Sequence, residues 1–284
     1  MKIIISFLLV LTFSVNAISG DKYPEIPVIN NLSKLNSIIS SGKSNDKKIP
    51  KPKDFSFTVN PYLWTIAAGG TIGIPNSPSG YPKSYEFNKS FSDAVKNLKM
   101  AFMIGGKFKY KRVSLYYDMV YINLKQFDLK IPEGYGILSA NTTSKQFITD
   151  LSLAYSFPMS NKNIALDAYA GTRIWATDNE ITLLLNDNSQ NMKSSSKSWV
   201  DPIVGINAKF QLSKSWFAYV RSDFGGFGAN SQYTFMFLGG FGYKFAPNWN
   251  TTLGVKDLSV DYNKDNYLFN LNQYGLILSI GYVY

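Results

Sequence analysis

The end of the chain alternates apolar and polar residues with a period of two. One face is formed by Tyr274, Leu276, Leu278, Ile280, Tyr282 and Tyr284, and the other by Gln273, Gly275, Ser279 and Gly281. This pattern is typical of a β-strand with two different faces, because successive side chains point to opposite sides. The apolar face covers residues 274–284, about one membrane thickness for a tilted strand. We therefore expect a strand whose outer face meets lipid.

The same alternation recurs throughout residues 54–284. We count ten segments, at 55–74, 99–110, 113–126, 143–157, 164–177, 199–212, 215–228, 231–245, 249–262 and 267–284. Each can cross a bilayer, which takes about 9–11 tilted residues. The sequence therefore predicts an all-β fold, a transmembrane antiparallel up-and-down β-barrel of ten strands. Eight strands are the alternative if two segments fuse or lie outside the wall.

Short and long connections alternate between these segments. The short ones are 111–112, 158–163, 213–214 and 246–248, and the long ones are 75–98, 127–142 and 178–198. Outer-membrane barrels have short periplasmic turns and longer external loops. We therefore expect both termini on the periplasmic side. The outer rim should be low where the last two outer loops, near 229 and 264, are short.

The alternation slips in three places. Phe269 and Leu271 lie on the parity opposite to Leu276, the ninth segment slips near Asp257, and the first slips around Trp64. A change of parity predicts either a bulge or a strand that continues above the membrane. For the last strand we expect a bulge near Gln273.

The N-terminal region predicts export. Lys2, an apolar run from residue 3 to residue 13 and the small-residue site Val15-Asn16-Ala17 are typical of a cleaved signal peptide at 1–17. Residues 18–53 are rich in Lys, Pro, Asn and Ser, which predicts a largely disordered periplasmic leader. Beyond residue 17, no run of about 18 apolar residues predicts a membrane helix.

The chain contains neither cysteine nor histidine. This composition excludes disulfides, thiolate metal sites and catalysis by a Ser-His-Asp triad. We expect no enzymatic activity, no cofactor and no metal site. Half of the net charge of +10 lies in residues 1–53, and the surplus of five in residues 54–284 is scattered along the barrel, so we expect no binding to nucleic acid.

Several charged residues fall on the parity that faces the lumen. They are Lys107, Asp118, Asp150, Asp167, Arg173, Lys209, Arg221, Asp223, Lys244 and Lys256. Such charges should pair with one another, because an unpaired buried charge costs several kcal/mol. The favoured interpretation is a plug of salt bridges that holds a narrow barrel rigid, since a barrel of about eight strands is filled by its own side chains. The alternative is a selectivity ring in a small pore.

Aromatic residues lie at the predicted membrane interfaces. Trp216 and Trp249 each open a strand just after a short turn, and Tyr282 and Tyr284 close the last strand. Aromatic girdles at both interfaces are typical of outer-membrane barrels.

Residues 90–98 predict a short amphipathic helix in the first long loop. Ser90 or Ser92 can cap it, and Phe91, Val95 and Leu98 are spaced for one face. Such a helix would either plug the barrel mouth or lie on the rim.

Five pieces of the chain carry a family resemblance. They are Pro61-Tyr62-Leu63-Trp64, Phe91-Ser92-Asp93, the run from Trp199 to Gly205, the run from Gly225 to Gly228, and the terminal Tyr284. With them the chain resembles a family of Gram-negative outer-membrane β-barrel proteins, loosely called porin-like, over about residues 55–284. The resemblance implies the barrel fold, and recognition of the terminal aromatic strand by the barrel-assembly machinery. It implies no settled activity and no catalytic residues.

These observations predict an outer-membrane protein with a structural or narrow-pore role. Outer-membrane lipids and lipopolysaccharide are the expected surroundings, and the external partner is unknown. The alternative is a surface protein that adheres or binds through loops 75–98, 127–142 and 178–198. A soluble barrel and a membrane enzyme are less favoured.

Overall fold

The computed structural model describes residues 54–73, 83–131, 137–187 and 189–284, so the predicted signal peptide and leader lie outside the described residues. Its elements are β1 (Phe55–Trp64), β2 (Ala67–Gly73), β3 (Ser84–Lys89), α2 (Phe91–Asn97), β4 (Leu98–Tyr110), β5 (Val113–Asp128), β6 (Ile137–Ser156), β7 (Ile164–Leu185), β8 (Gln190–Gln211), β9 (Trp216–Gly225), β10 (Tyr233–Ala246), β11 (Trp249–Lys264) and β12 (Tyr267–Val283).

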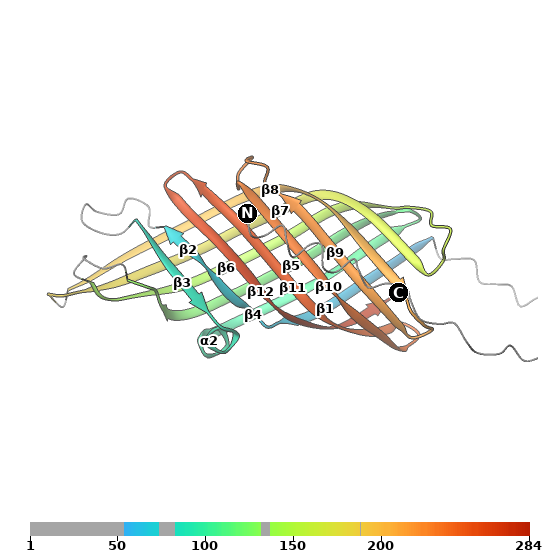
Figure 1. Ribbon diagram of the computed structural model, residues 1–284, viewed down its shortest axis with the longest axis horizontal. Coiled ribbons are helices and arrows are strands. Elements are labelled where there is room, and N and C mark those ends of the chain that lie inside the picture. Colours follow the sequence, from blue (N-terminus) through green and yellow to red (C-terminus); the bar gives the residue numbers. More distant parts are fainter. Residues whose placement is uncertain (1–53, 74–82, 132–136, 188) are drawn as a thin grey trace, which may run out of the picture. The chain divides into compact units, whose positions relative to one another are not determined.

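The strands close into a barrel. From β4 to β12 each strand pairs antiparallel with the next one in the chain, and β1 pairs with both β4 and β12. β1 and β2 lie one after the other along β12, so together they fill one position in the wall, and β3 extends the sheet from β2. The prediction of a ten-strand antiparallel barrel is confirmed (Figure 1).

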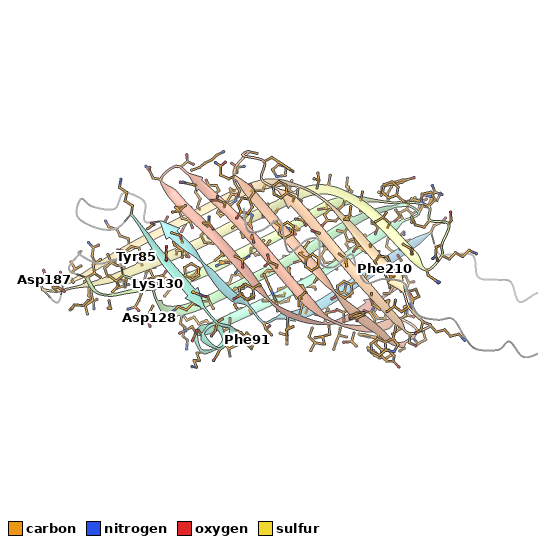
Figure 2. All side chains as sticks on the ribbon, viewed as in Figure 1. Tyr85, Phe91, Asp128, Lys130, Asp187 and Phe210 are labelled. Carbon is orange, nitrogen blue, oxygen red and sulfur yellow. The ribbon has the colours of Figure 1, made fainter. Side chains whose placement is uncertain are left out.

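One end of the barrel is closed by short turns, and the strands at the other end extend to unequal heights. The turn end carries the short connections near 111–112, 158–163, 213–214 and 247–248. At the opposite, rim end, β7 and β8 stay paired as far as Leu184 and Gln190, and Figure 2 places Asp187 at the far tip of this hairpin. The β11–β12 hairpin instead turns at Asp265–Asn266. The rim is therefore low beside β9–β12, as predicted.

Two predicted loops are largely strands. β5 continues to Asp128 and β6 begins at Ile137, while β7 continues to Leu185 and β8 begins at Gln190, so the loops predicted at 127–142 and 178–198 are wrong in extent. At the rim end the outward side chains are polar, for example Asp178, and a polar strand above the membrane resembles a loop in sequence. The loop predicted at 75–98 contains β3 and α2, and part of it falls in the undescribed residues 74–82.

The bulge predicted near Gln273 is also wrong. β11 and β12 pair without a register shift from Trp249–Tyr282 to Lys264–Tyr267. Phe269 and Leu271 are buried at 1% and 3% exposure, whereas Leu276 and Leu278 are half exposed. The apolar side chains change sides of the wall because the interior of the barrel is apolar at the rim end, while the backbone runs on unbroken.

The strand that pairs with the other edge of β12 is interrupted, because β1 ends at Trp64 and β2 begins at Ala67. Between β1 and β2, the Thr65 N–H donates to the Leu276 carbonyl at 2.8 Å, and the Leu276 N–H donates to Thr65 Oγ1 at 2.8 Å. The described pairing of β1 with β4 ends at Pro61–Ile104, and beyond it β2 pairs with β3. This leaves a seam in the wall between β2–β3 and the first half of β4. The sequence slip around Trp64 falls at this seam.

Candidate functional site: a layered lumen and a seam in the wall

A band of exposed apolar side chains surrounds the barrel. On β12 it includes Leu276, Leu278 and Ile280, each more than half exposed, and it continues over the neighbouring strands with Leu253, Phe241, Val204, Ile206 and Leu153. On β12 the band covers residues 274–284, about 25 Å across the membrane for ten steps of roughly 3.3 Å tilted by about 40°. An apolar surface this large and continuous fits lipid contact. Among the described residues, no helix is long and apolar enough to span a membrane.

The predicted interface aromatics lie at the turn-end edge of this band. The rings of Trp216 and Tyr243 are tilted by 49° with centroids 4.9 Å apart, and Trp249 meets Tyr282 edge-on at 5.0 Å. Trp216, Trp249 and Tyr284 are each 44–57% exposed. Aromatic side chains in this position suit a membrane interface, because the ring is apolar and its polar group reaches water.

The centre of the lumen holds a closed ion network. Arg173 has no exposed side-chain area and binds Asp150 through two bonds of 2.8 Å, from Nε and from Nη2. Its Nη2 also reaches Asp223 Oδ1 at 3.0 Å, and its Nη1 donates to Thr234 Oγ1 at 3.0 Å. These bonds tie β6, β7, β9 and β10 together across the barrel. A fork-shaped guanidinium shared by two carboxylates is a strong arrangement in a poorly solvated site.

Two further clusters extend this layer. Lys256 lies 3.3 Å from Asp118, and the Tyr62 hydroxyl links them by accepting from Lys256 at 3.0 Å and donating to Asp118 at 2.7 Å. Arg221 donates to the Tyr169 hydroxyl at 3.1 Å, and that hydroxyl donates to Asp223 at 2.8 Å. Five of the ten predicted lumen charges therefore share ion pairs, and Arg221 joins them through Tyr169.

The remaining predicted charges lie toward the turn end. A cavity of about 440 Å³ opens there, lined in part by Lys107, Lys209 and Asp167. Asp167 accepts hydrogen bonds from Tyr116 and Asn207, while the Lys107 and Lys209 ammonium groups lie over the rings of Tyr116 and Phe217. Lys244 is exposed near the end of β10 and forms no ion pair with another described residue.

Toward the rim end the lumen is filled by aromatic rings. Trp175 and Trp199 stack with centroids 5.6 Å apart, Tyr262 lies 4.3 Å from Trp199, and Phe269 meets both tryptophans edge-on. Trp175 is fully buried. No prediction from the sequence covers this aromatic layer. Its signal in the sequence is the change of parity at Phe269, and the bulge predicted from that change is wrong.

A buried carboxylate fastens the low side of the rim. Asp201, with no exposed area, accepts from the Ser231 N–H at 2.8 Å, from Ser231 Oγ at 2.6 Å and from Trp199 Nε1 at 3.1 Å. The bond to Ser231 holds the connection between β9 and β10 against the barrel. Within the described part of the chain, no three His, Cys, Asp or Glu side chains are grouped to hold a metal ion.

The predicted helix lies at the seam. α2 is capped by Ser90, whose Oγ accepts from the Asp93 N–H while the Asp93 carboxylate accepts from the Ser90 N–H and Oγ. The pKa of the Asp93 carboxyl is lowered mainly by the hydrogen bond from the Ser90 side chain and next by the one from the Ser90 backbone N–H. Phe91, Val95 and Leu98 are each 40–50% exposed, and Figure 2 shows Phe91 on the outside of the barrel. The helix contacts β2, β3 and β5, so it covers the wall and does not plug the lumen.

Several solved structures show a weak similarity to this chain. The sequence matches no protein-family model and no curated protein. Among solved structures, Neisserial surface protein A is 14% identical, with 81% of this chain and 96% of that chain covered and a TM-score of 0.30. The translocator domain of the autotransporter NalP from Neisseria meningitidis is 8% identical, covering 88% and 93%, with a TM-score of 0.41. The attachment invasion locus protein Ail of Yersinia pestis is 10% identical, covering 82% and 100%, with a TM-score of 0.33.

Proposed function

We propose that the chain is an outer-membrane barrel with a closed lumen, which holds its tall rim above the membrane surface and does not act as a pore. The observation that carries this proposal is the burial of Arg173 between Asp150 and Asp223. A water-filled channel exposes the side chains that line it, but Arg173 and Trp175 have no exposed area. They close the lumen at two successive levels, one charged and one aromatic.

The apolar band supports the membrane location. A soluble barrel would present half-exposed Leu276, Leu278 and Ile280 to water, which favours aggregation. In our proposal this band is surrounded by outer-membrane lipids and lipopolysaccharide. The barrel-assembly machinery would insert the chain after export, with the turn end in the periplasm.

Cysteine labelling tests both the closure and the orientation, because the chain contains no cysteine of its own. Ser194→Cys lies exposed on the β8 part of the rim, and Thr58→Cys lines the turn-end cavity. In intact cells, a small membrane-impermeant maleimide should label Ser194→Cys only. Thr58→Cys should become labelled once the outer membrane is permeabilised.

The other labelling patterns decide against the proposal. Labelling of Thr58→Cys in intact cells, at the rate seen after permeabilisation, would show an open lumen. If Ser194→Cys stays unlabelled until the cells are permeabilised, the location or the orientation is wrong. Planar-bilayer recordings give a second test, in which the refolded protein should show no conductance steps.

A second candidate function is binding through the tall rim. The paired ends of β7 and β8 rise beyond β9–β12 and carry exposed polar side chains, among them Lys193, Ser194 and Ser196. A ribbon of this kind can present a surface to another cell. Removing residues 180–194 and closing the hairpin with Asn-Gly should reduce adherence of expressing cells to an epithelial monolayer, while heat-modifiable gel migration is kept. Unchanged adherence would exclude this role for the hairpin.

A further inference from the structure

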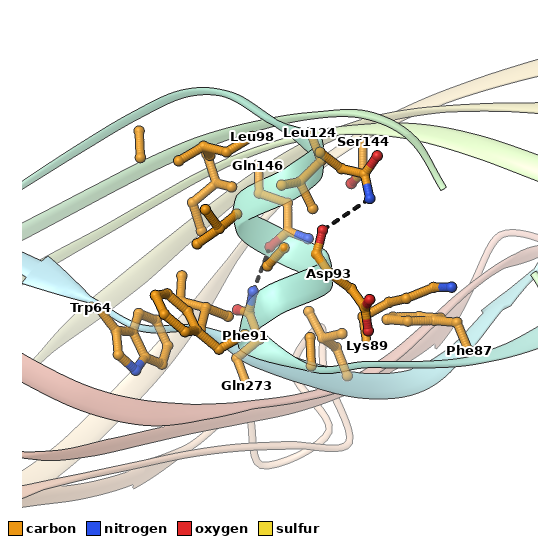
Figure 3. A pocket seen from close by; sticks show the side chains of 18 of the residues that line it. Trp64, Phe87, Lys89, Phe91, Asp93, Leu98, Leu124, Ser144, Gln146 and Gln273 are labelled. Atoms are coloured by element: carbon orange, nitrogen blue, oxygen red, sulfur yellow. Dashed lines mark hydrogen bonds between the residues drawn. The ribbon is translucent and has the colours of Figure 1, made fainter. Parts of the chain in front are cut away.

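An apolar cavity lies behind the seam in the barrel wall. Its volume is about 80 Å³, and Figure 3 shows it between α2 and the interior of the barrel. Its walls come from α2, from each of the strands β1 to β6 and from β12, with Trp64, Ile72, Phe87, Leu124 and Leu271 among them. The cavity is separate from the turn-end cavity, with which it shares no lining residue in the described chain.

The cavity has a route to the outside. Phe91, Val95 and Leu98 line it, and the same three side chains are about half exposed on the outer surface. Beside them, Leu63 on β1 and Phe102 on β4 are 69% and 51% exposed, and both flank the unpaired edge of β4. Leu63 pairs with Leu278 of the apolar band. The route therefore leads sideways into the lipid zone, near its rim-end edge.

The inner end of the cavity is polar and incompletely satisfied. Gln273 donates from Nε2 to Gln146 Oε1 at 3.2 Å, as drawn in Figure 3. Gln273 Oε1 and Ser144 Oγ have no hydrogen-bond partner among the described residues, although both side chains are only 2% exposed and both line the cavity. A buried polar atom without a partner costs stability, so two of them at the end of one apolar cavity point to a ligand.

The unsatisfied pair selects the chemistry of that ligand. A hydroxyl group can donate one hydrogen bond and accept two, so it can donate to Gln273 Oε1 and accept from Ser144 Oγ at once. It satisfies the site for either orientation of the Gln273 amide, because it can also accept from an NH₂ group. A carboxylate only accepts, and the inner end of the cavity offers it no cation. The charged residues that line the cavity, Lys89 and Asp93, lie at the α2 end.

We propose that this cavity binds the hydroxyl end of a neutral, single-chain alcohol that enters sideways from the membrane through the seam. An engineered apolar cavity of about 150 Å³ holds one benzene molecule, so a cavity of 80 Å³ takes the hydroxyl and the first few carbons. The rest of the chain extends past Phe91 and Val95 into the lipid. The proposed alcohol site does not depend on the closed lumen, so a finding that the lumen is open would not contradict it.

Quenching of tryptophan fluorescence tests the site directly, because Trp64 lines the cavity. The full chain is refolded in micelles with Trp216→Phe and Trp249→Phe, which removes the two lipid-facing tryptophans. Titration with 2-bromoundecan-1-ol, whose bromine lies beside the hydroxyl and therefore enters the cavity, should quench the fluorescence with saturation. The saturable part should disappear when Trp64→Phe is added, and unbrominated undecan-1-ol should reverse it by competition.

Matched variants locate the bound molecule. Ala101 lines the cavity, so Ala101→Phe should abolish the saturable quenching. Ala170 is exposed on the outside of β7 and lies away from the cavity, so Ala170→Phe should leave the quenching unchanged. Both variants are compared only if they keep heat-modifiable gel migration, and the competition experiment needs neither of them.

The hydroxyl preference has its own test. 2-Bromoundecane and 2-bromoundecanoate should bind roughly three- to tenfold more weakly than the alcohol, the range for one or two lost hydrogen bonds. Combining Gln273→Leu with Ser144→Ala should remove the difference between the alcohol and the alkane. Quenching that rises without saturation, or that persists in Ala101→Phe, would overturn the site. Equal affinities for the alcohol and the alkane in the unaltered cavity would overturn the hydroxyl assignment.

Discussion

The two halves of the barrel wall place their apolar side chains on opposite sides. In the half near the turn end, apolar side chains such as Leu278 face outward and the lumen carries charges such as Arg173. In the half near the rim end, apolar side chains such as Leu258 and Phe269 face inward, and outward positions carry Lys145 and Asp178. The backbone of β11 and β12 crosses from one half to the other without a shift in register.

This difference shows how far the lipid extends. Where the surroundings are apolar, the wall turns its apolar side chains outward and collects its polar groups in the lumen. Where the surroundings are water, the same strands pack like those of a soluble barrel. On β12 the change falls between Tyr274 and Asn272, and the Asn272 amide donates to Asp257 on the neighbouring strand at 3.3 Å.

The largest effect is expected from the buried ion network. Arg173→Met leaves Asp150 and Asp223 without their shared cation and should lower the free energy of unfolding by roughly 3–5 kcal/mol. Lys145→Met breaks an exposed pair with Asp178 in the other half and should cost about 0–1 kcal/mol. Chemical unfolding in phospholipid vesicles measures both. Similar losses would mean that the two environments do not differ as described.

Truncation of an apolar side chain should show the reverse asymmetry. Leu258→Ala opens a cavity in the rim-end core and should cost roughly 2–5 kcal/mol. Leu253→Ala, on the same strand but 57% exposed in the apolar band, should cost less, since lipid fills the space. The same unfolding assay compares them, and an equal cost would place Leu253 in a packed interface.

A charge on the outer face should locate the edge of the lipid. Leu278→Arg places a guanidinium in the apolar band and should destabilise the barrel by roughly 2–4 kcal/mol if it lies near the midplane. Asn270→Arg, eight residues earlier on the same face of β12, should have almost no effect in vesicles. A large effect at Asn270 would move the edge of the lipid toward the rim.

The smallest effect concerns α2, at the boundary between the halves. Ser90→Ala removes the N-cap and should destabilise the helix by about 1 kcal/mol. Because the folded-state pKa of Asp93 is lowered, the contribution of its carboxylate is present above the unfolded pKa and is lost as the pH falls through the folded value. Amide exchange of residues 91–97, corrected for intrinsic rates, should therefore show less protection at acidic pH. Ser90→Ala should weaken this dependence, and Ser92→Ala serves as the control.

The sequence predicted the features that lipid imposes. The parity of Leu276, Leu278 and Ile280 correctly predicted an outward apolar face, and the ten alternating segments correctly predicted the number of strands. The parity of Arg173, Asp150 and Asp223 also placed them in the lumen, where the structure joins them. These predictions succeeded because a strand's period and the burial of charge are local rules.

The features that were not predicted correctly depend on where the lipid ends along the strands. The identity of a single residue does not indicate that position. The rim-end parts of β7 and β8 look like loops because their outward side chains are polar, and Phe269 looks like the result of a bulge because the core lies on its side. The side cavity could not be predicted, since Gln146 and Gln273 meet across the barrel and are 127 residues apart. The slip around Trp64 was the one local sign of the seam.

The inversion of parity along β12 has a consequence for how the barrel assembles. If β12 paired with β11 one residue out of register, Leu276 would turn into the charged lumen and Phe269 would turn out into water. In a strand with one apolar face along its whole length, a slip would be destabilising in one environment only. In β12 the same slip is destabilising both in the lipid and in water. Burial of apolar side chains therefore favours the correct register of β12 twice, once in the membrane and once above it. Each half opposes a register slip while the barrel closes.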